Sequence, residues 1–156
     1  MGMLVGLACA LALGAIFYGA MAYQLADGPS QGVKTQAPEP GALLALANAQ
    51  LLWERTDEQE VGGEICTVTT RVYRTAEGLE AEAVSAGPAA YIARLSEEKW
   101  TAQLITGFTL AGLDAVYSLR GGEGLLSCRD GEHIYMLRCA ANEQTLYAMG
   151  AGAYFE

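Results

Sequence analysis

Basic side chains are scarce in this chain. Its 156 residues include nine Lys or Arg against 18 Asp or Glu, which gives a formal net charge of −9. The basic residues stand singly between Lys34 and Arg138, without the clusters that neutralise phosphates. This scarcity argues against nucleic acid and anionic lipid headgroups as partners, whereas the acidity itself favours solubility.

Residues typical of catalytic and cofactor sites are also few. The chain has one histidine and no Cys-x-x-Cys pair, and the segment 121–124 (GGEG) lacks the Lys-Ser/Thr of a phosphate-binding loop. Glu80 and Glu82 share one face of a predicted strand, which does not make the opposed carboxylate pair of an acid–base site. The sequence therefore predicts no catalytic, cofactor or metal residues.

Charge is absent before Asp27, and residues 1–26 form an apolar run longer than the ~20 residues that cross a bilayer. Two interpretations remain open. The segment is a signal anchor that stays, or a signal peptide cut after Ala22, where Ala20-Met21-Ala22 forms an A-x-A site. The length of the run and the lack of Lys or Arg at its start favour the membrane anchor. We expect the following domain to lie on the extracytoplasmic side, or to be secreted if the segment is cleaved.

Composition divides the rest of the chain in two. Residues 27–41 gather Gly, Pro, Ser and Gln, which predicts a flexible linker, and residues 42–156 then form a single domain. Apolar and β-branched patterns within this domain predict three helices, a loop and six extended runs. The helices are expected over 43–53, 89–100 and 143–154, the loop over 54–64, and the extended runs over 64–74, 79–85, 103–109, 115–119, 124–129 and 132–140.

Turn and cap residues connect these elements. Gly78 suits the positive φ of a tight hairpin after Thr75, and this turn would place Arg74 opposite Glu80 as a cross-strand ion pair. Asp130-Gly131 is the strongest short hairpin signal of the chain, and Asn142 is a good N-cap for the last helix. The order of elements predicts an α+β fold with one antiparallel sheet and helices packed on it.

The segment 112–117 (GLDAVY), the hairpin that ends in 134–137 (IYML) and a closing helix together resemble the Mog1/PsbP-like α+β domains and bacterial extracytoplasmic domains tethered to membranes. The resemblance covers about the last 95 residues, counted from the sequence. It is architectural and transfers no functional residue. It implies a binding or scaffolding module.

Cys128 and His133 form the sharpest candidate site. If Asp130-Gly131 is a two-residue turn, these two residues face each other, and a thiol beside an imidazole is the arrangement of a thiolate nucleophile. With Cys66 and Cys139 they also supply enough ligands for zinc, although the spacings argue against it. The thiols are either all reduced, or Cys66 pairs with one of the other two; a Cys128–Cys139 disulfide is too long.

Eight Trp and Tyr residues are spread over the predicted elements, which indicates core packing in the first place. The leading hypothesis is a non-enzymatic binding or sensor domain, held at a membrane by residues 1–26, whose partner is another protein. A carrier or sensor of a small apolar ligand is the second hypothesis, since the aromatics would line a closed pocket. A thiol-dependent enzyme or metal protein built on Cys128 and His133 is the third.

Overall fold

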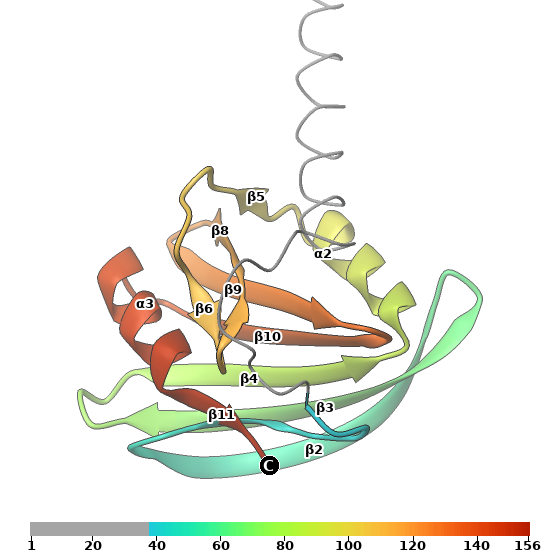
Figure 1. Ribbon diagram of the computed structural model, residues 1–156, viewed down its shortest axis with the longest axis horizontal. Coiled ribbons are helices and arrows are strands. Elements are labelled where there is room, and N and C mark those ends of the chain that lie inside the picture. The colour runs from blue at the N-terminus through green and yellow to red at the C-terminus, as the bar shows by residue number, and fades with distance from the viewer. Residues whose placement is uncertain (1–37) are drawn as a thin grey trace, which may run out of the picture. The chain divides into compact units, whose positions relative to one another are not determined.

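The computed structural model describes residues 38–156, which belong to one compact unit built mainly from β-strands (Figure 1). Strands make up 55% of these residues and helices 16%. The predicted α+β class is therefore wrong, because the described chain is mostly β. Nowhere within 38–156 does a helix have the length and hydropathy needed to span a bilayer, and the predicted membrane segment lies outside the described residues.

Seven strands form one antiparallel sheet, which consists of two meanders joined where β4 pairs with β10. The first meander contains β2 (Ala49–Val61), β3 (Glu64–Thr75) and β4 (Glu80–Gly87). The second contains β8 (Val116–Arg120), β9 (Glu123–Asp130) and β10 (His133–Cys139), with β5 (Thr101–Ala102) at its edge. The strand order is therefore β2-β3-β4-β10-β9-β8-β5.

The apolar run predicted as a helix over 43–53 instead forms β1 (Leu44–Leu46) and the start of β2. Asn48 has a φ of +57° and turns the chain between the two strands. Leu44, Ala45 and Leu46 are all buried, so β1 carries apolar side chains on both faces. Periodicity does not separate such a strand from a buried helix, and the pairing of β2 with β3 decides the outcome.

The acidic stretch predicted as a loop over 54–64 is also a strand. Residues 54–61 continue β2 and pair in unbroken register with β3, and the turn at Gly62-Gly63 uses positive φ angles of +61° and +86°. β2 is an edge strand, and its exposed charges discourage pairing with another chain. The charges that indicated a solvated loop are therefore the charges of a protected sheet edge.

The hairpin and cap predictions are largely confirmed. Gly78 has a φ of +80°, and Arg74 pairs with Glu80 at 3.1 Å across the strands. The backbone N–H of Thr145 donates to Asn142 Oδ1 at 2.9 Å, at the start of α3 (Glu143–Gly152). Of the four later extended runs, three are β8, β9 and β10, whereas 103–109 has no regular structure until β6 (Thr109–Leu110).

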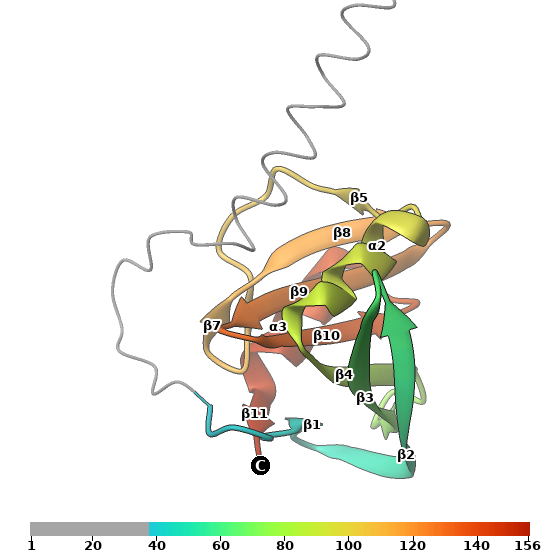
Figure 2. The ribbon, with the colours of Figure 1, turned by 90° about the vertical axis from the view of Figure 1, so that its right-hand side faces the viewer.

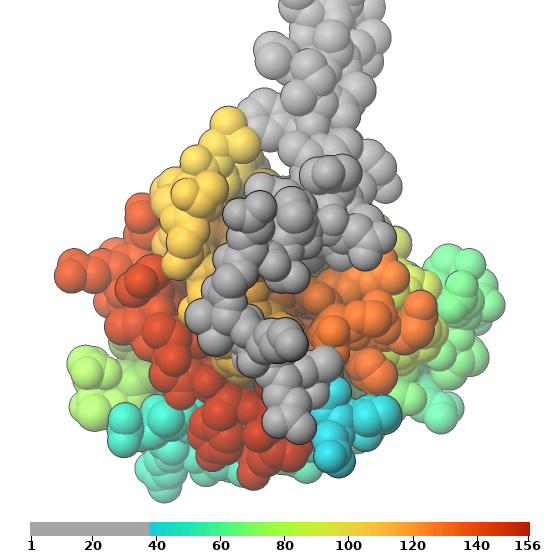
Figure 3. Space-filling view, viewed as in Figure 1, coloured from blue at the N-terminus to red at the C-terminus, as the bar shows by residue number. Residues whose placement is uncertain are grey.

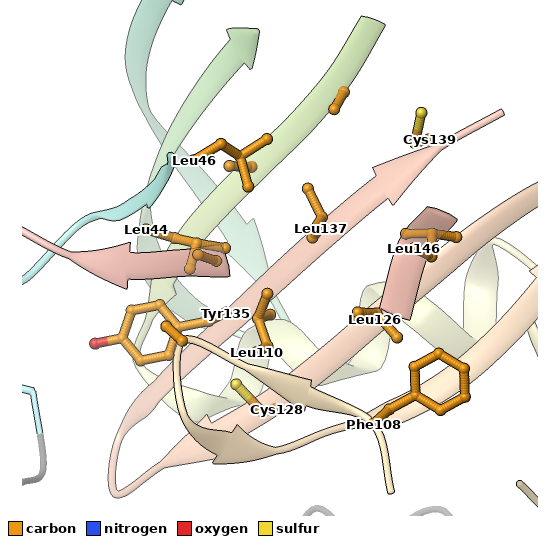
Figure 4. Close-up of a cluster of buried hydrophobic side chains, with 14 of the residues drawn as sticks. Leu44, Leu46, Phe108, Leu110, Leu126, Cys128, Tyr135, Leu137, Cys139 and Leu146 are labelled. Carbon is orange, nitrogen blue, oxygen red and sulfur yellow. The ribbon is translucent and has the colours of Figure 1, made fainter. Parts of the chain in front are cut away.

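One face of the sheet, called here the core face, is covered by α3 and by two small two-stranded sheets. The first is the hairpin of β6 with β7 (Leu113–Asp114), and the second pairs β1 with β11 (Ala153–Phe155) from the two ends of the domain. Their side chains pack with those of the sheet into one apolar cluster (Figure 4). Its labelled members are Leu44, Leu46, Phe108, Leu110, Leu126, Cys128, Tyr135, Leu137, Cys139 and Leu146.

The opposite face, called here the helix face, carries the 3₁₀ helix η1 (Ala89–Ile92) followed by α2 (Ala93–Glu97), which lie across the strands (Figure 2). The single helix predicted over 89–100 is therefore two shorter pieces. Tyr91 and Leu95 are the buried residues of these pieces, while Ile92, expected on the inner side, is only half-buried. Pro88 precedes η1 and follows a cis peptide bond to Gly87.

The C-terminus is held by backbone bonds to Leu43, just before β1, and by a side-chain bond to β3 of the first meander. Leu43 and Glu156 exchange two backbone hydrogen bonds of 2.8 and 3.1 Å, and the space-filling view places the red C-terminal segment beside the blue start of the described chain (Figure 3). The guanidinium of Arg71, whose side chain is 11% exposed, pairs with Glu54 at 2.6 Å and with Glu156. Arg71 of β3 thus links β2 and the C-terminal residue through its two ion pairs.

Candidate functional site

A cavity of about 500 Å³ lies between the helix face of the sheet and the η1–α2 segment, and we call it the helix–sheet cavity. Ligand pockets of proteins have volumes of about 300–1,000 Å³. Aromatic, aliphatic and charged side chains share its walls. The lining residues are Gln59, Thr70, Glu82, Val84, Tyr91, Arg94, Leu95, Glu97, Glu98, Trp100, Leu125, Met136 and Arg138.

Strand register explains why residues of β3, β4, β9 and β10 reach this cavity, which Gln59 of β2 also lines. Directly paired residues of neighbouring strands lie on the same face of a sheet. Thr70 of β3 pairs with Val84 of β4, which pairs with Met136 of β10. Two residues further along β4 and β10, and so on the same face, Glu82 pairs with Arg138, which pairs with Leu125 of β9. All these side chains therefore project toward η1 and α2.

Glu82 and Arg138 form the closest ion pair of the cavity, at 2.6 Å. The two side chains are only 24% and 34% exposed, so the surrounding water screens them incompletely. Burial alone lowers the pKa of Arg138, but the hydrogen bond and the charge of Glu82 outweigh it, and the pKa is raised. The guanidinium therefore stays charged inside a partly closed site.

Glu98 connects this pair to a second arginine. Its Oε2 accepts from Trp100 Nε1 at 2.9 Å and from Arg120 Nη1 at 3.3 Å, and it lies 3.8 Å from Arg138 Nη1. The guanidinium of Arg120 stacks over the Trp100 ring at 4.3 Å from the centroid. Trp100 is 7% exposed, so its ring orientation is fixed by packing and by these two contacts.

The phenol of Tyr91 lies among these charges. Burial raises the pKa of Tyr91 and the charge of Glu98 raises it further, whereas Arg94 and Arg138 lower it. The net result is a raised pKa, so the phenol is neutral at physiological pH. Tyr91 thus adds to the cavity lining a neutral hydroxyl that is able to donate or accept a hydrogen bond.

Two buried hydroxyls lie in the same layer of the sheet. Ser127 is paired with the cavity residue Met136, and Ser118 is paired with the cavity residue Leu125. Both serines are fully buried, and among residues 38–156 neither hydroxyl has a hydrogen-bond partner. Buried polar groups without partners are rare and occur more often near functional sites.

The predicted Cys128–His133 site is not formed, because the hairpin turn is displaced by one residue. Asp130 pairs with His133, so the two loop residues are Gly131 and Glu132, and Gly131 alone has a positive φ, of +55°. Glycine at the first loop position is the pattern of a type II′ turn. Cys128 consequently lies opposite Tyr135 instead of His133.

Cys128 is also unsuited to nucleophilic chemistry. It is 1% exposed and lies within the apolar cluster of the core face (Figure 4). Burial, with a smaller contribution from Asp130, raises the pKa of its thiol well above the ordinary value. The thiol therefore stays protonated, whereas a catalytic cysteine needs an accessible thiolate.

The other two thiols within residues 38–156 are buried as well. Cys66, Cys128 and Cys139 are all free, with Cys66 Sγ 3.7 Å from the carbonyl of Pro88 and Cys139 Sγ 3.2 Å from that of Glu80. Burial raises the pKa values of Cys66 and Cys139 too. Within the described part of the chain, no three His, Cys, Asp or Glu side chains are grouped to hold a metal ion.

His133 instead borders a second cavity of about 400 Å³ on the core face. Its walls include the hydroxyl side chains of Thr67, Thr69 and Ser85. The hydroxyl of Ser85 accepts from the backbone N–H of Leu44 at 2.8 Å, and those of Thr56 and Thr69 bond to each other at 2.9 Å. These internal bonds give at least two of the hydroxyls a structural role.

Five of the eight Trp and Tyr residues that were predicted to pack in the core are buried, whereas Trp53, Tyr147 and Tyr154 are exposed. Phe108 stacks on Tyr117 with ring centroids 4.8 Å apart, and Tyr135 packs against Phe155 at 4.6 Å. Tyr91 and Trp100 are the aromatic residues of the helix–sheet cavity. The charged residues around them were not predicted, because they are separate in sequence and resemble ordinary surface charges.

Comparison with protein-family models, with curated proteins and with solved structures found no match to this chain. The resemblance to Mog1/PsbP-like domains stays a prediction. The candidate site therefore rests on the geometry of the helix–sheet cavity.

Proposed function

We propose that this domain binds a small molecule in the helix–sheet cavity and acts as a binding or sensor module without catalytic activity. The observation that carries the proposal is the partly buried network of Glu82, Arg138, Glu98 and Arg120 around a cavity of ligand size. Attachment to a membrane and a protein partner stay predictions from the sequence.

The network indicates a function because partly buried ion pairs contribute little to the stability of a sheet, since removing the charges from water costs free energy. Replacing a buried ion pair by packed apolar residues is often neutral or stabilises a protein by about 1–4 kcal/mol. The core face of this sheet is packed with apolar side chains, whereas the helix face keeps charges beside an open volume. Such local departures from stable packing are expected at binding sites.

The same lining weighs against a carrier for a purely apolar ligand. Five of the thirteen lining residues are charged, and an apolar ligand would remove water from them without replacing its hydrogen bonds. A thiol-dependent enzyme has no support from Cys128, whose side chain is buried and whose thiol has a raised pKa. A ligand with polar groups suits the cavity better.

Trp100 provides the assay for this proposal. The chain contains two tryptophans, so Trp53→Phe leaves Trp100, in the cavity wall, as the single indole fluorophore. We expect compounds of a small-molecule library to change its emission in the purified full chain. A library without any saturable response would overturn the proposal.

Two matched substitutions on β3 locate the binding site. Thr70 lines the helix–sheet cavity and Thr67 lines the second cavity, on the opposite face. Thr70→Phe should fill the first cavity and abolish the response, while Thr67→Phe should leave it unchanged. The reverse pattern would place the ligand in the second cavity and contradict the proposal.

A further inference from the structure

From the charges that line the helix–sheet cavity, we infer that its ligand is a small zwitterion, a free α-amino acid with an apolar side chain. This inference rests on the proposed function and specifies the chemistry of the ligand. It follows from the hydrogen bonds that the side chains of the cavity already make and from their donor and acceptor atoms that have no partner within residues 38–156.

Arg94 and Glu98 supply the first step. The backbone N–H of Glu98 donates to the carbonyl of Arg94 at 2.9 Å, so the two residues lie one helical turn apart at the end of α2. Both line the cavity. Residues at this spacing are neighbours on a helix, with Cβ atoms about 5–6 Å apart. A cationic and an anionic side chain thus stand side by side at the cavity wall.

Both side chains keep unused hydrogen-bonding capacity. Within residues 38–156, the hydrogen bonds to the Glu98 carboxylate all go to Oε2, which leaves Oε1 available. Arg94 donates only from Nη1, at 2.8 Å to Glu97, although a guanidinium has five N–H donors. The ammonium and carboxylate of an α-amino acid are attached to one carbon atom, so they match this adjacent pair of opposite charges.

The remaining lining residues also fit an α-amino acid with an apolar side chain. Glu82 and Arg138 repeat the arrangement of one carboxylate and one guanidinium on the sheet side. Val84, Leu95, Leu125 and Met136 supply apolar surface beside these charges for an aliphatic or aromatic side chain. Tyr91, which also lines the cavity, is close enough to both sets of charges for them to affect its pKa.

A ligand with a single charge fits less well. The lining has three carboxylates, Glu82, Glu97 and Glu98, and two guanidiniums, Arg94 and Arg138. An anion would lie near the three carboxylates and a cation near the two guanidiniums, and like charges in contact discriminate strongly against a ligand. A zwitterion satisfies both signs and leaves the charge balance of the cavity unchanged.

The experiment compares four probes by isothermal titration calorimetry on the full chain. The probes are leucine, the anion N-acetyl-leucine, the cation leucinamide and the uncharged N-acetyl-leucinamide. We expect leucine to bind at least about tenfold more tightly than either singly charged probe, which is a difference of about 1.4 kcal/mol. Equal affinities for all four probes, or tighter binding of a singly charged probe, would overturn the inference.

Arg94→Gln separates the two halves of the ligand. It should weaken leucine about tenfold and leave leucinamide, which has no carboxylate, unchanged. Arg74→Gln is the matched control, because Arg74 forms an exposed pair with Glu80 outside the cavity. Equal losses for leucine and leucinamide in Arg94→Gln would contradict the assigned role of Arg94.

The outcomes also distinguish the inference from the proposed function. If library compounds bind in the helix–sheet cavity and are blocked by Thr70→Phe, but leucine has no advantage over its derivatives, the binding function stands and the zwitterion inference fails. If neither the library nor any leucine probe binds, both fail.

Discussion

Gly150→Ala tests how closely α3 packs on the core face. A Cβ atom placed on Gly150 would lie 2.3 Å from the backbone oxygen of Thr109 and 2.5 Å from Leu126 Cδ1. Thr109 belongs to the β6–β7 hairpin, and the N–H of Ala111 in the same hairpin donates to the carbonyl of Gly150 at 3.1 Å. The helix and the hairpin are therefore already in direct backbone contact.

The size of the effect follows from these contacts. Ordinary contact begins at 3.4 Å, so α3 would have to move by about 1 Å (3.4 minus 2.3 Å) against the fully buried Leu126. Overpacking of a core costs about 1–3 kcal/mol, with backbone clashes at the upper end, and the better helix propensity of alanine returns up to about 1 kcal/mol. We expect a net loss of about 2 kcal/mol, which lowers Tm by ~8 °C in a domain of this size.

Gly152→Ala in the same helix is the control. Nothing lies within 4 Å of its Cβ position, so alanine should be neutral or stabilise the domain by about 0.5–1 kcal/mol. Thermal and urea unfolding of the full chain, followed by circular dichroism, measures both variants. The packing described for α3 would be refuted if Gly150→Ala were as stable as Gly152→Ala.

Three further predictions concern stability, thiol chemistry and pH. Arg71→Ala should lower the free energy of unfolding by about 1–3 kcal/mol, since it removes a largely enclosed guanidinium that pairs with Glu54 and Glu156. Arg55→Ala, in an exposed pair with Asp57, should change it by less than about 1 kcal/mol, and equal effects of the two substitutions in urea unfolding would contradict the role of Arg71. Cys128 should resist alkylation at pH 8 until the domain unfolds, as followed by mass spectrometry of the peptide that contains it, and rapid labelling of the folded chain would disprove its burial. Burial, assisted by Asp130 and Cys128, raises the pKa of Tyr135 from 10.0 to about 12, so its stabilising contribution is complete below pH 10 and is lost as the pH rises toward 12. The free energy of unfolding should fall over that interval and fall less steeply in Tyr135→Phe, and identical profiles would refute this assignment.

Local patterns predicted the second meander well. Residues 115–119, 124–129 and 132–140 alternate between the two faces and form β8, β9 and β10. Gly78 and Asn142 are signals in which one residue type meets one backbone requirement, and both were confirmed. Such signals work because their cause lies within a few residues of chain.

The errors have longer-range causes. Residues 43–53 carry apolar side chains that suit a helix, but pairing of β2 with β3 and of β1 with β11 outweighs that preference. The acidic composition of residues 54–64 predicts a loop, because local composition carries no information about the pairing of these residues with β3. At the hairpin near Cys128, a turn displaced by one residue moves the partner of Cys128 from His133 to Tyr135.

The candidate site was out of reach of sequence patterns for a related reason. Glu82 lies in β4, Arg94 and Glu98 at α2, and Arg138 in β10, so their contacts depend on the pairing of β4 with β10 and on where α2 crosses the sheet. Nothing in the residues that flank these four charges marks them as members of one site. A prediction of this site from the sequence would have required the correct register of β4 against β10.

The most direct test of the helix–sheet cavity is the NMR spectrum of the full chain during a titration with leucine. The indole N–H of Trp100 donates to Glu98 and gives a signal of its own, so binding beside Glu98 should shift it together with the amides of Tyr91 and Leu95. We predict saturable shifts at these three residues and small changes around His133 and Ser85. Shifts that gather around His133, or none at any leucine concentration, would contradict the assignment of this cavity as the binding site.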